Sequence, residues 1–290
     1  MVTQPEIQIQ KAYQHCLKIV AGHYENFPVA SLLLAKPLRQ PIAVIYAFAR
    51  SADDFADEGN DTEQQRLEKL NRYASSLDTL KYGENKDPIF IALQDVITKY
   101  QLPLQLFHDL LSAFTQDVTK KRYQNFEEVL DYCQRSANPV GRLLLHLLDQ
   151  ATPENLQQSD AICSSLQLIN FLQDIYQDYS ENNRIYIPMD EMQNYGVSET
   201  MIEQQQTTAA MRTLISQQTS RAKSLMLEGA PLGNRIGGSF GLQLRMMING
   251  GLQVLKLLEI QKENVFARPR LNVFDWIKIA RYALMKKYIQ

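Results

Sequence analysis

The sequence predicts an all-α protein, and three observations support this prediction. Glycine is sparse, at 12 of 290 residues, and no segment alternates apolar and polar residues as a half-buried strand would. Apolar residues instead recur at helical spacing along most of the chain, and proline and cap residues divide it into about ten helices. No linker-like composition or low-complexity stretch interrupts the pattern. We therefore expect one helical domain spanning residues 1–290.

Helix boundaries in the first half of the chain are predicted from proline, glycine and cap residues. Pro41 is expected in the first turn of a helix that Gly59 closes, because a missing N–H costs nothing at that position. Asp61 is the expected N-cap of the next helix, and Asp87-Pro88 has the pattern of a helix start. The predicted helices cover residues 6–22, 29–34, 41–59, 61–82, a stretch from 88, and 103–115.

Proline also marks the boundaries in the second half. Asn138-Pro139 is expected to interrupt a helix, since an internal proline removes a hydrogen bond and kinks the axis. Pro153 is expected to start a helix, and Ser198 to cap a long polar one. The predicted helices cover residues 126–150 with this interruption, 153–179, 198–227, 240–261 and 272–288.

The helix predicted over residues 41–59 carries an unusual polar row. Tyr46, Arg50, Asp53 and Asp57 share one face, directly beside the apolar stripe of the same helix. The carboxylates are therefore expected to point inward, and a buried unpaired carboxylate is very costly. A cation must offset these charges, and a metal ion is the most economical candidate.

A second pair of aspartates repeats this spacing. Asp174 and Asp178 share a helix face with Gln167 and Asn170, and apolar residues flank that row on both sides. Such a helix is largely buried, so its polar row is expected to line an internal cavity. Mg²⁺ prefers a few carboxylates completed by water and phosphate oxygens. Two such helices facing each other would clamp a diphosphate through Mg²⁺ and promote its departure, leaving a carbocation for an aromatic-lined cavity to shelter.

Three motifs resemble the landmarks of the squalene/phytoene synthase family. Residues 46–59 and 170–188 resemble its two aspartate-rich motifs, and residues 132–142 are similar to its third landmark. The resemblance runs from about His23 to the C-terminus. It implies the isoprenoid-synthase helical fold around a central apolar cavity, a Mg²⁺-dependent site and a C30-type isoprenoid substrate. The likeness is greatest to the bacterial members that form hydroxysqualene, and the stretches that carry it are residues 26–31, 136–141, 249–252 and 268–271.

The resemblance also implies roles for individual residues. Mg²⁺ and diphosphate would be held by Asp53, Asp57, Asp174 and Asp178. Substrate contacts are implied for Tyr46, Arg50, Gln173, Arg184, Tyr186 and, at the end of the first helix, His23 and Phe27. Catalytic roles are expected for Tyr132, Asn138 and Asn170. Asn138 lies at the predicted kink and is a candidate to position a water molecule. The alternatives are that Arg50 only pairs with acids of its own helix and that Tyr132 only fills the core.

Two positions depart from the pattern of the family's coupling enzymes. Those enzymes commonly have a basic residue near position 25 and an arginine just before the second motif, where this chain has Glu25 and Gln173. Fewer positive charges favour a site for one diphosphate, and hence a pre-coupled substrate. The expected reaction converts presqualene diphosphate and water to hydroxysqualene and diphosphate, in squalene and hopanoid biosynthesis. A head-to-head prenyl transferase making presqualene diphosphate, squalene or phytoene is the first alternative, and a non-catalytic helical assembly protein is the second.

Charge patterning bounds the expected partners. The net charge of −2 gives no indication of nucleic-acid binding. Residues 267–290 nevertheless hold six Lys or Arg and a single acid. This basic C-terminal helix is expected either to contact anionic lipid or to dock with a solvated basic face. Other enzymes of the squalene pathway are candidate partners.

The cysteines and the N-terminal residues indicate the expected cellular location of the protein. The three cysteines, Cys16, Cys133 and Cys163, show no zinc spacing and are expected to be buried reduced thiols. The N-terminus is polar, and no apolar run approaches the roughly 18 residues that span a bilayer. We therefore expect a cytoplasmic protein, with peripheral contact at the inner face of the membrane as the further option.

Overall fold

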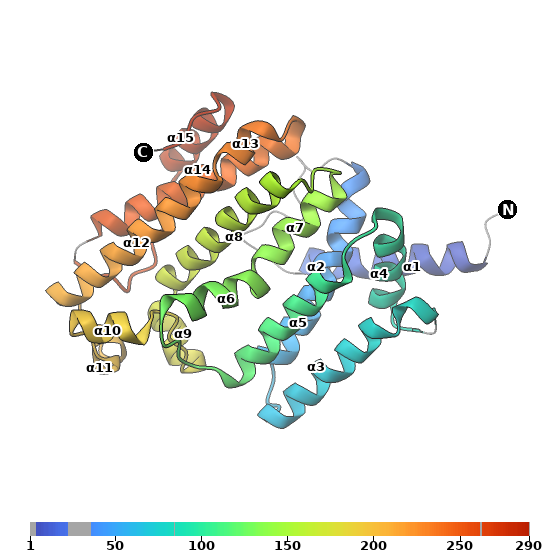
Figure 1. Ribbon diagram of the computed structural model, residues 1–290, viewed down its shortest axis with the longest axis horizontal. Helices are drawn as coiled ribbons and strands as arrows, with labels where there is room; N and C mark the ends of the chain where they lie inside the picture. Colours follow the sequence, from blue (N-terminus) through green and yellow to red (C-terminus); the bar gives the residue numbers. More distant parts are fainter. Residues whose placement is uncertain (1–3, 23–35, 84, 262, 290) are drawn as a thin grey trace. The chain divides into compact units, whose positions relative to one another are not determined.

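The computed structural model describes residues 4–22, 36–83, 85–261 and 263–289. Within these ranges the chain forms fifteen α-helices and one short 3₁₀ helix, η1 (Leu80–Tyr82) (Figure 1). The β-type contact among them is one isolated bridge between Arg122 and Ile185. The prediction of an all-α protein is confirmed. In the described part of the chain no helix is long and apolar enough to cross a membrane.

The chain divides into two compact units, which we describe separately. The first unit comprises Met1–Thr119 and Arg142–Ala151, and the second comprises Lys120–Gly141 and Thr152–Gln290. One helix, α7 (Asn138–Leu147), begins in the second unit and ends in the first. Two compact units can belong to a single domain, so the predicted single domain stays a prediction. The predicted central apolar cavity also stays a prediction.

The first unit is organised around α2 (Lys36–Asp57). This helix packs against the other four α-helices that lie wholly in the unit, α1 (Gln4–Gly22), α3 (Glu63–Asp78), α4 (Pro88–Tyr100) and α5 (Leu104–Thr119). Aromatic rings fill the centre of this packing. Phe48 of α2 stacks on Tyr73 at 5.1 Å between ring centroids and meets the edges of Phe90 and Phe107 at 6.1 and 5.3 Å. These rings anchor the helix that carries the first aspartate pair.

Two predicted helix starts in this unit are wrong. Helix α2 begins at Lys36, so Pro41 lies inside it. Because proline has no backbone N–H, the helical hydrogen bond to the Pro37 carbonyl is missing. Thr62, not Asp61, caps α3, because its hydroxyl accepts from Gln65 N while the Gln65 side chain accepts from Thr62 N.

Other boundaries of the first unit agree with the prediction. Gly59 adopts a left-handed conformation (φ 78°) just after α2, and the Asp87 side chain accepts from Ile89 N at the start of α4. Helix α1 covers the predicted 6–22, and α5 runs one turn beyond the predicted end at Thr115. The predicted helix over residues 29–34 lies outside the described residues.

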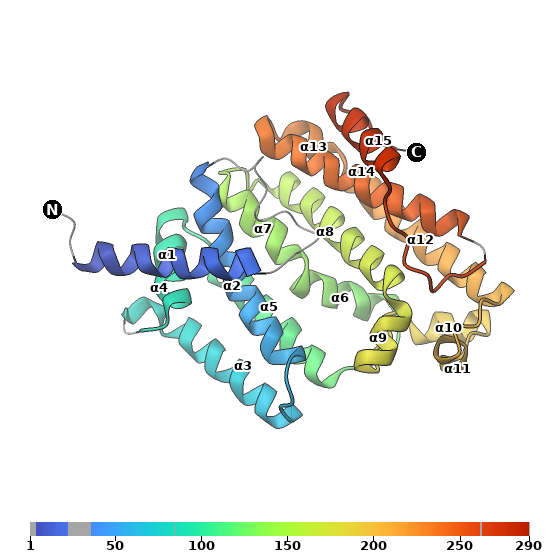
Figure 2. The same ribbon diagram turned by 180° about the vertical axis from the view of Figure 1, so that it is seen from behind.

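The second unit is a stack of long helices with shorter ones at its ends. Helix α12 (Ala209–Gly229) packs along α8 (Pro153–Gln173), α14 (Gly238–Ile260) packs on both, and α15 (Val273–Leu284) packs on α14 (Figures 1 and 2). The remaining helices are α6 (Phe126–Ser136), α9 (Ile175–Asn182), α10 (Met189–Tyr195), α11 (Glu199–Glu203) and α13 (Pro231–Arg235). The predicted break before Pro139 is confirmed, since α6 ends at Ser136 and α7 begins at Asn138.

Two long helices predicted in this unit are each divided in the structure. Ser198 caps only the five-residue α11, and Thr208 caps α12 after a turn in which Gln205 has φ 49°. The predicted helix over 153–179 bends at Asp174 (φ −114°, ψ 18°), which separates α8 from α9. The i→i−4 bonds continue on both sides of the bend, from Asp174 N to Asn170 O and from Asp178 N to Asp174 O.

Gly229, the last residue of α12, permits a close helix crossing and gives a stability prediction. A Cβ there would lie 2.5 Å from the Gln158 carbonyl oxygen of α8 and 2.5 Å from Ile162 Cγ1. Gly229→Ala is therefore expected to destabilise the protein by about 1–3 kcal/mol, as overpacking does. Gly250→Ala is the matched control, because nothing lies within 4 Å of its Cβ, and it should stabilise by up to about 1 kcal/mol through helix propensity. Urea unfolding of both variants measures this contrast, and equal midpoints would contradict it.

The three cysteines are free, as expected, and their burial gives a second prediction. Cys16 and Cys133 are buried and Cys163 is half-buried. Burial raises the pKa of Cys16 and Cys133 to about 12 and that of Cys163 to about 11. Since only the thiolate reacts, at pH 8 roughly 1 in 10⁴ of a thiol with a pKa of about 12, and roughly 1 in 10³ of one with a pKa of about 11, is nucleophilic. Titration with a disulfide reagent at pH 8 should detect almost no thiol in the native protein and three after denaturation, and rapid native labelling would contradict the burial.

Candidate active site

The first aspartate pair lies at the C-terminal end of α2, within a cluster of acidic residues. Asp53 is half-buried, with a side chain 38% exposed, whereas Asp57 in the last turn is exposed. The expectation that both carboxylates point inward is therefore wrong for Asp57. The pKa of Asp53 is raised to about 7, mainly by burial and next by the charge of Asp57. Arg50 lowers this pKa, and Asp117 and Asp54 raise it by smaller amounts.

Arg50 lies among these acids, one turn before Asp53. Its Nε is 2.6 Å from Asp54 Oδ1, its Nη1 is 3.3 Å from Asp53 Oδ2, and its Nη2 also pairs with Glu58. Tyr46, a further turn back on α2, is half-buried. Arg50 thus makes the intrahelical pairs that its sequence spacing allows. Its guanidinium also lies at the acidic cluster, where it could reach a bound phosphate, so its substrate contact stays a prediction.

Asp117 of α5 is a member of this cluster that sequence reasoning missed. The residue is only 4% exposed, and its charge raises the pKa of Asp53. A signal was present, because Asp117 continues the buried row of Leu110 and Ala113 along its helix. An acid on the apolar stripe of a helix is uncommon and marks a special environment.

The second aspartate pair lies at the bend between α8 and α9. Asp174 Oδ1 is 3.1 Å from Arg268 Nε, and burial raises the pKa of Asp174 while Arg268 lowers it. The adjacent Gln173 donates from Nε2 to the Pro269 carbonyl at 3.5 Å. Asp178, one turn on, is half-buried. The segment before α15 therefore contacts the second motif, and Arg268 is a partner of Asp174 that the sequence did not indicate.

Arg184 and Tyr186 are held in place by backbone hydrogen bonds rather than by a helix. Arg184 N donates to the Asp178 carbonyl at 3.0 Å, which ties Arg184 directly to the second motif. The next residue, Ile185, donates to Lys121 O at 3.0 Å, and Met189 donates to Tyr123 O at 2.9 Å. Residues 184–189 thus run beside residues 121–124.

Four aromatic residues gather around this segment, namely Tyr123, Tyr132, Phe171 and Tyr186. Tyr186 lies parallel to Phe171 at 3.6 Å between centroids, 5.6 Å from Tyr132 and 5.4 Å from Tyr123. All four are buried. Arg184, 4% exposed, donates from Nη1 to Tyr186 Oη at 3.1 Å. A buried guanidinium therefore lies at the edge of an aromatic cluster, an arrangement that suits an anion joined to an apolar group.

Asn138 is buried at the start of α7, and its side chain is oriented by α8. The Ser164 hydroxyl donates to Asn138 Oδ1 at 2.9 Å. Close packing holds this crossing, because a Cβ on Gly141 would lie 2.3 Å from Ser159 Oγ and 2.6 Å from Cys163 Sγ. One lone pair of the Asn138 oxygen is thus used by Ser164, and a carbonyl oxygen can accept a second bond. Its role with water stays a prediction.

The predicted site residues thus belong to both units, and each group is described within its own unit. In the first unit the structure brings together Arg50, Asp53 and Asp57. In the second it brings together Tyr132, Arg184 and Tyr186, and it holds Gln173 and Asp174 against residues 268–269. Asn170 is half-buried and lies one turn before Asp174. Its backbone carbonyl accepts a hydrogen bond from the Asp174 N–H. His23, Phe27 and Glu25 lie outside the described residues.

The acidic cluster of the first unit fits part of a Mg²⁺ site. Within the described ranges no three His, Cys, Asp or Glu side chains form a group that could hold a metal ion by themselves. Mg²⁺ commonly takes only one or two carboxylates and completes its shell with water and substrate phosphates. The crowded charges that raise the pKa of Asp53 would be offset by such an ion. The donor set therefore fits a cation that arrives with a phosphorylated substrate.

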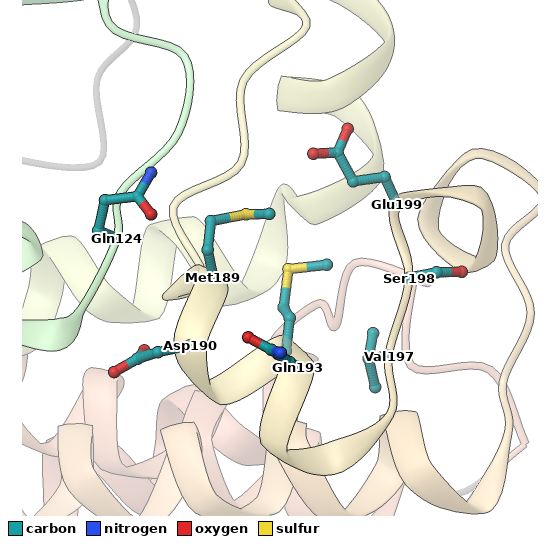
Figure 3. A pocket seen from close by; sticks show the side chains of 8 residues that line it. Gln124, Met189, Asp190, Gln193, Val197, Ser198 and Glu199 are labelled. Atoms are coloured by element: carbon teal, nitrogen blue, oxygen red, sulfur yellow. The ribbon is translucent and has the colours of Figure 1, made fainter.

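A separate pocket of about 480 Å³ lies in the second unit beside α10 (Figure 3). Met189, Met192 and Val197 give it apolar walls, and the labelled polar side chains come from Gln124, Asp190, Gln193, Ser198 and Glu199. None of the predicted site residues lines it.

Comparisons with known proteins identify the relatives of this chain. The sequence profile described as squalene/phytoene synthase matches residues 20–276. A hydroxysqualene synthase of Rhodopseudomonas palustris is 34% identical over 266 residues, 91% of this chain and 89% of that protein. One from Zymomonas mobilis is 39% identical over 71% of this chain and 69% of that protein. The crystal structure of squalene synthase HpnC from Alicyclobacillus acidocaldarius superposes with a TM-score of 0.83 at 33% identity, over 89% of this chain and 97% of that one.

Proposed function

Because the chain belongs to the squalene/phytoene synthase family, we propose that it is an enzyme acting on a prenyl diphosphate, and specifically a hydroxysqualene synthase. The proposed reaction is presqualene diphosphate plus water to hydroxysqualene plus diphosphate. The observation that carries this proposal is the similarity to hydroxysqualene synthases at 34–39% identity, compared with 28% for a phytoene synthase of Synechococcus elongatus. The buried Arg184 and the aromatic cluster beside the second motif also support the proposal that the substrate is a prenyl diphosphate.

Binding of the diphosphate falls to the charged groups of the two motifs. Arg184, buried and tied to Asp178 by its backbone N–H, presents a rigid fork that suits two phosphate oxygens. Arg50 is held at the acidic cluster by Asp53 and Asp54 and can exchange one of these pairs for phosphate. Mg²⁺, when bound to Asp53, Asp57, Asp174 and Asp178, would neutralise the charge that grows on the departing diphosphate.

The aromatic cluster provides the environment for ionisation. When the carbon–oxygen bond breaks, its electron pair leaves with the diphosphate and a carbocation remains. The buried rings of Tyr132, Phe171 and Tyr186 keep bulk water away and offer their π faces to the cation. One water molecule then adds its oxygen to the cation and releases a proton. Asn138, oriented by Ser164, is our candidate to position that water.

Product analysis tests the reaction. The purified protein is incubated with Mg²⁺ and either presqualene diphosphate or farnesyl diphosphate, in water enriched in ¹⁸O, and the products are identified by mass spectrometry. We expect an ¹⁸O-labelled C30 alcohol from presqualene diphosphate and no C30 product from farnesyl diphosphate. A C30 product from farnesyl diphosphate would instead establish a head-to-head prenyl transferase, and an unlabelled hydrocarbon from presqualene diphosphate would reject capture by water.

A further inference from the structure

The C-terminal helix α15 presents an unusual concentration of apolar surface. Of the eleven exposed large hydrophobic side chains among the described residues, six lie between positions 273 and 285. They are Val273, Phe274, Trp276, Ile277, Leu284 and Met285, and Phe274 is 82% exposed. Single exposed apolar residues are ordinary on protein surfaces, but a contiguous group of this kind marks an interaction site.

Most of this apolar group faces away from the helix on which α15 packs. Helix α15 packs on α14 (Figures 1 and 2). Asp275, Ile279 and Ala283 are buried, and α14 bonds to the Asp275 side chain and to the Ala283 carbonyl. At 100° per residue, Val273, Ile277 and Leu284 fall on the opposite side. A helix at a protein surface ordinarily turns its polar face outward. Here the outward face carries exposed apolar side chains as well as exposed cations, so it is not a purely polar, solvated face.

Buried polar contacts fix α15 in this orientation. Gln253 of α14 donates to Asp275 Oδ1 at 2.8 Å and accepts from Lys278 Nζ at 3.0 Å. Near the other end, Arg245 Nε donates to the Ala283 carbonyl at 2.7 Å, and Asn249 Oδ1 accepts from Ile289 N at 2.9 Å. Because these bonds hold both ends of the helix, the exposed apolar face is a fixed feature of the surface and not a frayed terminus.

Positive charge surrounds the same face. Arg270, Arg281, Lys286 and Lys287 are all exposed, and Asp275, the one acid of residues 267–290, is buried. Apolar side chains flanked by Lys and Arg are the pattern of helices that lie in the interface of an anionic bilayer. A protein partner of ordinary composition would need acidic groups placed against each of these cations, whereas anionic headgroups are mobile and adjust to them.

We propose that the outward face of α15, with its flanking cations, docks on the surface of an anionic lipid bilayer. The apolar side chains would enter the region between headgroups and acyl chains, and the four cations would contact lipid phosphates. This docking does not depend on the proposed reaction, since it uses no residue of the two aspartate motifs.

Trp276 allows a direct test because it is the only tryptophan of the chain, is 51% exposed and directly precedes Ile277 of this face. The full chain is mixed with vesicles of phosphatidylcholine containing 30% phosphatidylglycerol, or of phosphatidylcholine alone. We expect a blue shift of tryptophan emission and quenching by brominated acyl chains with the anionic vesicles only. We also expect binding to weaken steeply as salt is raised. Absence of quenching with anionic vesicles would overturn the proposal.

Matched variants distinguish binding through the outward face of α15 from nonspecific binding of the protein to vesicles. Phe274→Ser with Ile277→Ser, and separately Lys286→Gln with Lys287→Gln, should each lower the vesicle partition coefficient at least tenfold. Leu227→Ser, on an exposed apolar residue of α12, should leave it unchanged. Thermal unfolding verifies that each variant is folded. Equal partitioning of the α15 variants and the parent chain would overturn the proposal, as would a concentration-dependent dimer that the α15 variants abolish while vesicle binding persists.

Discussion

Replacing Asp53 by asparagine is expected to lower kcat with the prenyl diphosphate substrate by about 10³-fold. The change removes one proposed Mg²⁺ ligand but keeps the shape of the side chain, and losing about 4 kcal/mol of charge stabilisation at the departing diphosphate gives a factor of this size. The same change should leave the folded state intact or raise its melting temperature. The reason is that burial, and next the charges of Asp57, Asp117 and Asp54, raise the pKa of the Asp53 carboxyl group and so disfavour its charged form. Steady-state kinetics at saturating Mg²⁺ and calorimetry measure the two effects.

Glu58→Gln is the matched control for this experiment. Glu58 is another acid at the end of α2 that pairs with Arg50, and its side chain is 61% exposed. Removing its charge should change kcat by less than about threefold, as expected for an exposed ion pair. Similar losses in the two variants would show that the net charge of the cluster, rather than the position of Asp53, governs activity.

Replacing Arg184 by methionine is the second change with a large expected effect. Methionine keeps much of the apolar stem but removes the guanidinium that lies 3.1 Å from Tyr186 Oη. Loss of two charge-assisted hydrogen bonds to phosphate, at about 1.5–3 kcal/mol each, should lower kcat/KM by about 10²-fold or more. The effect should be measured as kcat/KM together with the inhibition constant of inorganic diphosphate, which should rise in parallel.

Two further variants locate the origin of that loss. Arg184→Lys keeps the charge but not the planar fork, so its activity should lie between those of the parent chain and Arg184→Met. Arg212→Met removes an exposed arginine at the start of α12 and should behave as the parent chain. An unchanged inhibition constant for diphosphate in Arg184→Met would contradict the proposed contact.

Most of the fold was predictable because its determinants are local. Apolar spacing located the helices, and single residues such as Asp87 and Gly59 marked their ends. The wrongly predicted helix boundaries arise where two local signals for a helix start lie close together or where one signal is misleading. Ser198 and Thr208 are both good caps, and only the left-handed turn at Gln205 shows that each begins its own helix. The start of α2 was missed because Pro41 resembles a first-turn residue and is tolerated five residues into the helix.

The candidate site was predictable only where its residues lie on one motif. The spacing of Asp53 and Asp57 requires one helix face, and Arg184 follows Asp178 closely enough to be bonded to it. Tyr123 could not be found in this way, because it lies in an extended segment whose register with residues 184–189 comes from long-range backbone bonds. The pairing of Arg268 with Asp174 likewise joins positions far apart in the chain. Periodicity carries no information about such contacts.

The division of α7 has a consequence for the order in which this chain becomes structured during synthesis. The first unit is discontinuous, because Arg142–Ala151 belongs to it and Lys120–Gly141 does not. Leu143, Leu145 and Leu147 of that late segment are buried in the folded chain, so part of its apolar interior is missing until they emerge from the ribosome. At about 5–20 residues per second, this delay after Thr119 is on the order of seconds. A fragment ending at Thr119 should therefore expose apolar surface and aggregate. The growing chain can bury this surface only after the residues up to Ala151 have been synthesised.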